Sequence, residues 1–224
     1  KRQAAFSAIA RQVVSRGLTD GLDSKTIGKD LKAAATQAMV NRSDSYWTMI
    51  ASVFATRSRT WGMLSSFEEA GIERYEISAT LDEVSCDVCR FMNEQTFSVA
   101  SAVSAFKKVA ESDDPEAVVQ HQPFMSVGMA ESGEKGLFFG SGAGRQAVAR
   151  VSESAVGEKD ALGKFSGAMS GADLEKNGLS APPFHGHCRC ATIASFEAAP
   201  VQQEPARQPV FAPPAVVATV PVPA

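Results

Sequence analysis

Apolar residues recur at intervals of three and four positions along residues 2–70, the spacing that places them on one face of an α-helix. The pattern predicts a first helix over residues 2–17 that ends at Gly17. It predicts a second helix that is capped by Ser24. The apolar face of this second helix consists of Ile27, Leu31, Ala35 and Met39.

A longer third helix is predicted to begin near residue 44 and to end at Gly71. Its apolar stripe has nearly heptad spacing and consists of Trp47, Ile50, Phe54, Trp61 and Leu64. Core packing explains such a stripe. A subunit contact is the alternative, because both tryptophans of the chain lie on it.

Further along the chain the pattern changes from helical to alternating. Residues 75–79 alternate as a half-buried strand does, and residues 96–99 are the expected hairpin partner. After the C-x-x-C of Cys86 and Cys89, the segment "RFMNEQTFSV" is expected to form a turn and this short strand. Helices are expected again over residues 98–112 and from Asp114, and a last strand over residues 188–196.

Two segments have weak periodicity. Residues from about 123 to 180 are rich in Gly, Ser and Ala and are interpreted as an irregular insertion, with one or two helices near residues 144–156 and 172–176. Seven of the eleven prolines lie in residues 200–224, and proline disfavours both helix and central strand. This tail is therefore predicted to be extended and to tether the chain to another subunit.

Together these elements indicate an α+β fold: a mostly helical N-terminal half, a small zinc-stapled β element, an irregular insertion and an extended proline-rich tail. We expect a helical segment at residues 1–42, a domain at residues 43–199 with the insertion at about 100–180, and the tail at residues 200–224. The net charge of −3 gives no electrostatic reason to wrap nucleic acid. No apolar run approaches the roughly 20 residues of a membrane span, so no membrane partner is expected.

The zinc expectation comes from chelating side chains that are concentrated in two short segments, "SCDVC" and "HGHCRC". Thiolates and imidazoles in sets of four are the ligands of structural zinc. We expect a closed structural Zn²⁺ site, with no open position for catalysis. Its expected ligands are Cys86, Cys89, His185 and Cys188, with Cys190 as the substitute. His187 is expected to point away.

Other chemistry is open to the same residues. Four cysteines can form two disulfides, and a C-x-x-C between a strand and a helix of a βαβ unit is a redox motif. His185 or His187 can serve as the general base of a zinc-stapled nuclease. The glycine-rich segment "GLFFGSGAGRQ" can cradle a phosphate in a toxin or transferase domain, but its spacing is not that of a known phosphate-binding loop, so a flexible loop is the better interpretation. Arg189 is expected to pair with a carboxylate or backbone carbonyls, or to neutralise thiolates.

The two motifs and their order resemble the C-terminal domain of the phage Mu F-like minor head proteins, also called the phage head morphogenesis family. The resemblance covers residues 43–195, in which a long helix and a strand precede "TLDEVSCDVCRF" and "PPFHGHCRC" follows much later. The matching residues are Cys86, Cys89, Pro182, Pro183, His185, Cys188, Arg189 and Cys190. In that family the two halves lie close together in sequence. Here about 95 residues separate Cys89 from His185, so the chain carries an insertion.

The resemblance implies a structural protein of the virion and no enzyme: a minor head component near the portal that acts in head morphogenesis. Its expected partners are the portal protein or neighbouring head subunits, close to packaged DNA without specific binding to it. Its expected location is the phage head or neck, and the host cytoplasm during assembly. The alternative is a zinc-stapled nuclease or toxin domain carried by a phage head protein.

Overall fold

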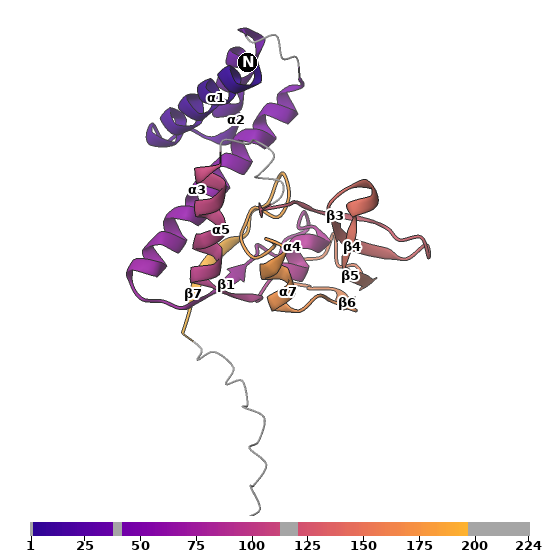
Figure 1. Cartoon of the computed structure of the whole chain (residues 1–224). Helices are drawn as coiled ribbons and strands as arrows, with labels where there is room; N and C mark the ends of the chain where they lie inside the picture. Colours follow the sequence, from indigo (N-terminus) through magenta and orange to yellow (C-terminus); the bar gives the residue numbers. More distant parts are fainter. Residues whose placement is uncertain (1, 38–41, 113–120, 197–224) are drawn as a thin grey trace, which may run out of the picture.

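The structure, a computed structural model, describes residues 2–37, 42–112 and 121–196, with side chains from Ile9 onward except Gln37 (Figure 1). Three expectations fall outside these residues. They are the place of Met39 on the second helix, the helix that starts at Asp114, and the extended tail at residues 200–224.

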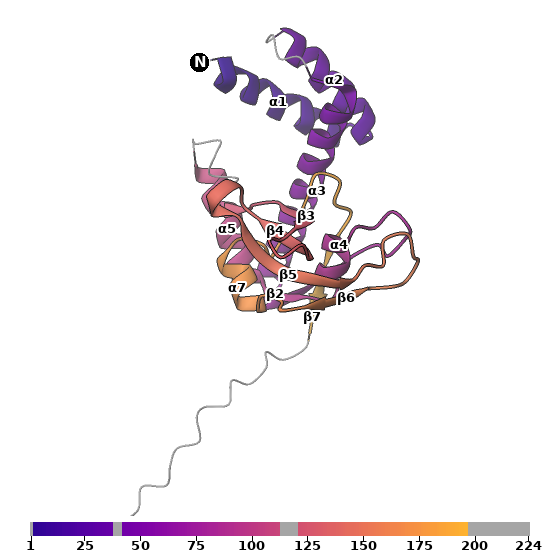
Figure 2. The ribbon, with the colours of Figure 1, turned by 90° about the vertical axis from the view of Figure 1, so that its right-hand side faces the viewer.

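The N-terminal half is helical, as predicted. It consists of α1 (Arg2–Thr19), α2 (Ser24–Gln37) and α3 (Asp44–Glu69). In both views α1 and α2 lie beside the first part of α3, away from the two sheets (Figures 1 and 2). The three helices share a small core of their own, which is made of Ala10, Val14, Ile27, Leu31, Ala35, Trp47 and Ala51.

The ends of the first two helices differ from the prediction. Gly17 lies inside α1, and the turn that ends this helix uses Gly21, whose φ is 69°. A Cβ atom at Gly17 would lie 2.6 Å from Cγ1 of Ile27, so this glycine permits the close approach of α2. At the start of α2 the backbone N–H of Thr26 donates to Oδ1 of Asp23 at 2.8 Å, so Asp23 is the cap in place of Ser24.

The third helix begins and ends where the sequence predicts. Ser43 caps it by accepting a hydrogen bond from the backbone N–H of Tyr46, and Gly71 ends it with a φ of 69°. Its apolar stripe packs into cores. Trp47 is 2% exposed in the N-terminal core, and Leu64 is fully buried in the main core. Burial of these side chains within one chain supports core packing over a subunit contact.

The expected small β element is a three-stranded antiparallel sheet of β1 (Arg74–Ser78), β2 (Thr96–Ser98) and β7 (Ala191–Ser195). The central strand is β1. Its residue Tyr75 lies opposite Phe97 of β2 and Ala194 of β7. The hairpin partner and the last strand are thereby confirmed. Pairing of β7 with β1 brings the chain on the two sides of the insertion together.

A short helix, α4 (Asp87–Met92), lies where a turn was expected. The expectation of a turn after the C-x-x-C was wrong. All six residues of α4 are buried, so the helix has no polar face that would reveal its period. The helix predicted over residues 98–112 is present as α5 (Val99–Glu111).

The inserted material is more regular than the sequence suggests. It forms a second antiparallel sheet, in the order β3 (Met125–Met129), β4 (Lys135–Phe139), β5 (Gln146–Glu153) and β6 (Lys164–Ser166). The helix expected near residues 144–156 is wrong, because β5 occupies that stretch. The short helix expected at residues 172–176 is present as α7 (Gly171–Lys176).

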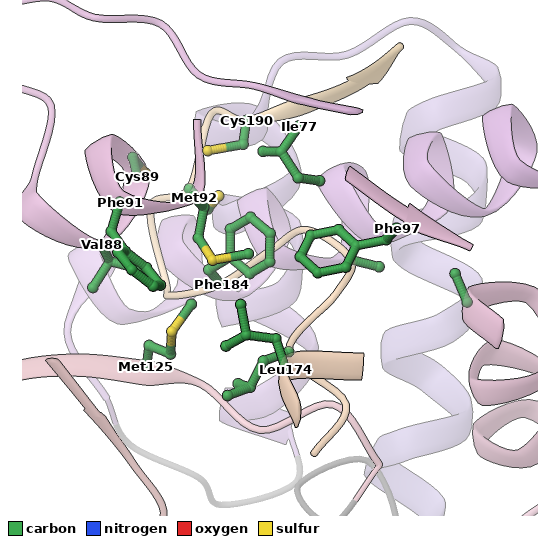
Figure 3. Packing of buried hydrophobic residues seen from close by; sticks show 14 of the residues in the cluster. Ile77, Val88, Cys89, Phe91, Met92, Phe97, Met125, Leu174, Phe184 and Cys190 are labelled. Carbon is green, nitrogen blue, oxygen red and sulfur yellow. The ribbon is translucent and has the colours of Figure 1, made fainter. Parts of the chain in front are cut away.

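Both sheets contribute to one main core. Leu137, Phe139 and Val148 of the second sheet belong to the same cluster of buried residues as Tyr75 and Phe97 of the first. Figure 3 shows Met125 of β3 and Leu174 of α7 facing this interior, with Cys89 and Cys190 along one side of it. The insertion is therefore part of the folded body.

None of the helices within residues 2–37, 42–112 and 121–196 is long and apolar enough to cross a membrane.

Candidate metal centre

The two cysteine-bearing segments meet beside the first sheet. Cys86 is the residue before α4, and Cys89 lies in the first turn of that helix. The second segment, residues 185–190, leads directly into β7. Because β7 pairs with β1 and α4 follows β1 after a short loop, the fold brings together side chains that are about 95 positions apart.

All five expected donor residues lie in this cluster. Nε2 of His185 is 3.2 Å from Sγ of Cys86 and 3.0 Å from Sγ of Cys89. The donor atoms of Cys86, Cys89 and His185 lie within 4.8 Å of one another, and so do those of Cys89, Cys188 and Cys190. Cys89 belongs to both groups and connects them.

Burial favours a tightly enclosed centre. Cys89, Cys188 and Cys190 are 7%, 3% and 2% exposed, and Cys86 and His185 are half-buried. A cavity of about 20 Å³ is lined by residues of the cluster and its surroundings. Those residues are Thr80, Val84, Ser85, Cys86, Cys89, His185, His187, Arg189 and Cys190. Its size suits one small ion and no substrate molecule. All four cysteines are free thiols, so the two-disulfide alternative finds no support.

The thiols differ in acidity because they crowd one another. Hydrogen bonding from Cys89 and then from His185 lowers the pKa of Cys86 to about 4. Hydrogen bonding from Cys190 and Cys89 lowers the pKa of Cys188 to about 2. The pKa of Cys89 and that of Cys190 are both raised, and in each case the largest cause is a hydrogen bond with Cys188. Neighbouring thiolates repel each other, so only a bound cation allows all four sulfurs to ionise together.

An ion pair connects the two segments next to the cluster. The guanidinium of Arg189 contacts Asp82 at 2.8 Å and 2.6 Å, and the hydroxyl of Ser85 also donates to Asp82. Arg189 thus pairs with a carboxylate, one of the roles expected for it. The hydrogen bonds from Arg189 and Ser85 hold the pKa of Asp82 well below its usual value.

Arg90 is a structural residue that the sequence did not point to. It is 2% exposed and donates to four backbone carbonyls, those of Ser85, Asp82, Glu158 and Ala161. Two of the carbonyls come from the loop before α4 and two from the loop between β5 and β6. Arg90 therefore connects the insertion to the loop before α4. The only signal in the sequence is one arginine placed before an apolar pair, "RFM".

Asp87 makes a second connection of this kind. Its carboxylate is buried and lies 2.7 Å from Nζ of Lys135. The hydroxyl of Ser154 donates to it at 2.7 Å. Both partners belong to the insertion, one on β4 and one just after β5. The insertion therefore supports α4, the helix that carries Cys89, from two sides.

The remaining histidines stand apart from the donor groups. His187 is exposed and belongs to neither group of the described residues. Its backbone N–H donates to Nδ1 of His185 at 3.3 Å. His121 is half-buried and also lies outside both groups.

The redox alternative is only partly met. A strand precedes the C-x-x-C and α4 begins within it, contrary to the turn that was expected. However, β1 and β2 are antiparallel, so the unit is not βαβ. Three further donors also surround the pair, which is unlike a dithiol that is open to a partner thiol.

In the described part of the chain, neither the nuclease alternative nor the toxin or transferase alternative gains support. No Asp or Glu of the described residues joins the donor groups. The glycine-rich segment forms β4 and a tight turn, Gly142–Gly144. Arg145 lies over the ring of Phe138 at 3.7 Å and is engaged there.

The donor atoms of the centre determine which ions it could hold. Sulfur and imidazole donors are typical ligands of Zn²⁺ and other soft ions, so the residues present could hold such an ion. No protein-family model, curated protein or solved structure matches this chain.

Proposed function

We propose that this chain is a structural protein of a phage head whose fold is fastened by one zinc ion. The observation that carries the metal part is the convergence of five soft donor residues in two groups that share Cys89, with four of the five lining one small cavity. They come from two segments about 95 positions apart. Zinc is the expected ion, because sets of thiolates with imidazole favour it over hard cations.

The ion has a structural role. Four protein ligands complete a tetrahedron and leave no position for water or a substrate. The ion would join the loop before β7 to α4 and so close a long stretch of chain. Most of that stretch is already packed into the core, and hence the ion reinforces a fold that has other support.

Five donors compete for four positions, and one hydrogen bond favours a particular choice. The backbone N–H of His187 donates to Nδ1 of His185, which places the proton of a neutral ring on Nε2. The Nε2–H group then donates to the sulfurs of Cys86 and Cys89. This favours four cysteine ligands, with His185 as a hydrogen-bond donor. The expected set of Cys86, Cys89, His185 and Cys188 is the competing choice.

X-ray absorption on the purified protein separates the two ligand sets. We expect about one zinc per chain with four sulfur neighbours at about 2.3 Å. Three sulfurs and one nitrogen at about 2.0–2.1 Å would restore His185 as a ligand. A protein that carries no metal after purification in the presence of zinc would overturn the proposal for the site.

The phage role is supported by the paired motifs in their order and by the way the residues that carry the resemblance come together. "CDVC" and "HGHCRC" meet beside the small sheet that β1, β2 and β7 form. The proposed partners are the portal protein or neighbouring head subunits, close to packaged DNA without specific binding. The proposed location is the head or neck of the virion, and the host cytoplasm during assembly.

An incorporation assay tests the phage role apart from the zinc. Particles assembled with the wild-type chain should contain it, and particles assembled with Cys89→Ser should contain less, because the variant loses its metal and the support that the metal gives to the fold. The exposed change His187→Ala is the matched control and should leave incorporation unchanged. If the folded, zinc-loaded chain never enters particles, the head role is wrong while the zinc site stands. Nuclease activity that depends on His187 would instead favour the alternative.

A further inference from the structure

The outer edge of β3 is open in the part of the chain that the structure describes. β3 is an end strand of the second sheet and pairs only with β4. The N–H of Met125 points away from β4 and donates to the carbonyl of Phe184 at 2.8 Å. Alternate residues of an antiparallel strand direct their backbone groups to the same edge. The backbone N–H and carbonyl groups of Val127 and Met129 therefore point away from β4, as those of Met125 do.

Few of these outward groups are satisfied. The carbonyl of Met129 accepts from Nη1 of Arg145 at 3.2 Å. Within the described residues, the N–H and carbonyl of Val127 have no hydrogen-bond partner outside the β3–β4 ladder. An unpaired strand edge is a template for another strand.

The side chains at this edge are apolar and uncovered. Val127 is 41% exposed and Met129 is 58% exposed. By alternation they lie on the same face as Met125, which is 3% exposed in the main core. The apolar face of β3 thus continues from the main core at Met125 to Val127 and Met129, whose side chains are exposed. The strand, "MSVGM", has no charge or proline, the devices that protect edges against pairing.

One segment of the chain has the complementary chemistry. Residues 215–220, "AVVATV", are the longest stretch without proline in residues 200–224. They are uncharged, and four of the six are β-branched. Pro214 and Pro221 flank them and would limit any pairing to these six positions.

We propose that residues 215–220 of one copy add to the outer edge of β3 of a neighbouring copy as a fifth strand. Backbone groups of Val127 and Met129 then gain partners, and alternate side chains of the added strand cover the two apolar side chains. The contact joins different surfaces of two copies, so it runs head to tail.

The connecting chain is long enough for this exchange. Residues 197–214 separate the added segment from Phe196 at the end of the described chain. At about 3.1 Å per residue in a proline-rich chain they span about 55 Å. A compact body of this size has a radius of gyration of about 16 Å, so the segment reaches beyond its own body.

Two proline substitutions test the exchange in the full chain. Val217→Pro removes a donor from the centre of the added segment. Val127→Pro removes the outward N–H of β3 without a loss to the β3–β4 ladder, because that N–H faces away from β4. Val210→Pro is the matched control, since it lies in the same tail outside the segment.

The expected result is complementation. Wild type and Val210→Pro should associate as concentration rises, and the amide of Met129 should exchange at least about tenfold more slowly than in dilute protein. Val217→Pro and Val127→Pro should each remain monomeric, whereas an equimolar mixture of the two should form dimers, because each supplies the part that the other lacks. Protection of Met129 that is the same at all concentrations, or that survives Val217→Pro, would overturn the proposal. Zinc content should be equal in all variants, so this result is independent of the metal site.

Discussion

Arg189 forms a bidentate ion pair with the carboxylate of Asp82. Nη1 donates to Oδ2 at 2.8 Å, and Nη2 donates to Oδ1 at 2.6 Å. Asp82 follows β1 in the chain, and Arg189 lies between Cys188 and Cys190. The pair therefore joins the same two segments that the metal would join. It orients the ligand-bearing backbone whether or not an ion is bound.

Asp82→Asn should weaken zinc binding while the fold persists. Without the paired charge the segment at residues 185–190 loses an anchor, and changes beside metal ligands typically cost 10- to 100-fold in affinity. Competition with a chromogenic chelator measures the change. Glu83→Gln is the matched control, because Glu83 is an exposed neighbouring carboxylate. Equal zinc affinity in Asp82→Asn and wild type would show that the pair has no influence on the centre.

The effect of Asp82 should not vary with pH near neutrality. Arg189 lowers the pKa of Asp82 below its value of 3.8 in the unfolded chain. A lowered pKa stabilises the folded state above the unfolded value, and this contribution fades as pH falls through the folded value. The difference in urea midpoint between wild type and Asp82→Asn should therefore be constant from pH 6 to pH 8. A difference that disappears on going down to pH 6 would assign the effect to another group.

Arg90→Met should destabilise the fold strongly. The change leaves four carbonyls around a buried position without their donor, and unsatisfied buried groups cost about 1–3 kcal/mol each before relaxation. We expect a loss of about 3 kcal/mol or more, measured by urea unfolding. Arg59→Met, at an exposed position of α3, is the control and should change little. A loss under about 1 kcal/mol would mean that water replaces the arginine.

Two glycines of the helical half should respond in opposite directions to alanine. At Gly28 a Cβ atom would lie 2.9 Å from the backbone of Thr48, so Gly28→Ala must push α2 away from α3 at a cost of about 1–3 kcal/mol. At Gly62 nothing lies within 4 Å, so Gly62→Ala should stabilise α3 by about 0.5–1 kcal/mol. Thermal unfolding compares them. Destabilisation by both changes would contradict the packing described for α2 and α3.

The helical half and the first sheet were predictable because each element has one buried face and one that is less buried. Ile27, Leu31 and Ala35 recur with helical spacing and are all buried. Likewise Tyr75 and Ile77 are buried at alternate positions of β1, with half-buried residues between them. The convergence of the five candidate donor residues was predictable too, because cysteine is rare in the chain and its spacing is typical of metal sites.

The second sheet was missed in part because β4, one of its two inner strands, is covered on both faces. Leu137 faces the core, and Phe138 on the other face lies under the guanidinium of Arg145, so "GLFF" does not alternate. Arg90 was missed for a different reason. A buried arginine that binds only backbone carbonyls leaves no paired acidic residue in the sequence.

The long helix α3 has a mechanical consequence. Its 26 residues extend about 39 Å, and its two ends are held in different cores, Trp47 in one and Leu64 in the other. Midway along α3, Thr56 donates to the carbonyl of Cys188 at 3.4 Å. Nearer the start of the helix, Met49 packs against Gly186. The segment that carries His185, Cys188 and Cys190 therefore contacts α3 between its two cores. A force on α1 and α2 would reach the ligand segment through α3, and a bound ion would add to the resistance that the core and the Asp82–Arg189 pair already provide.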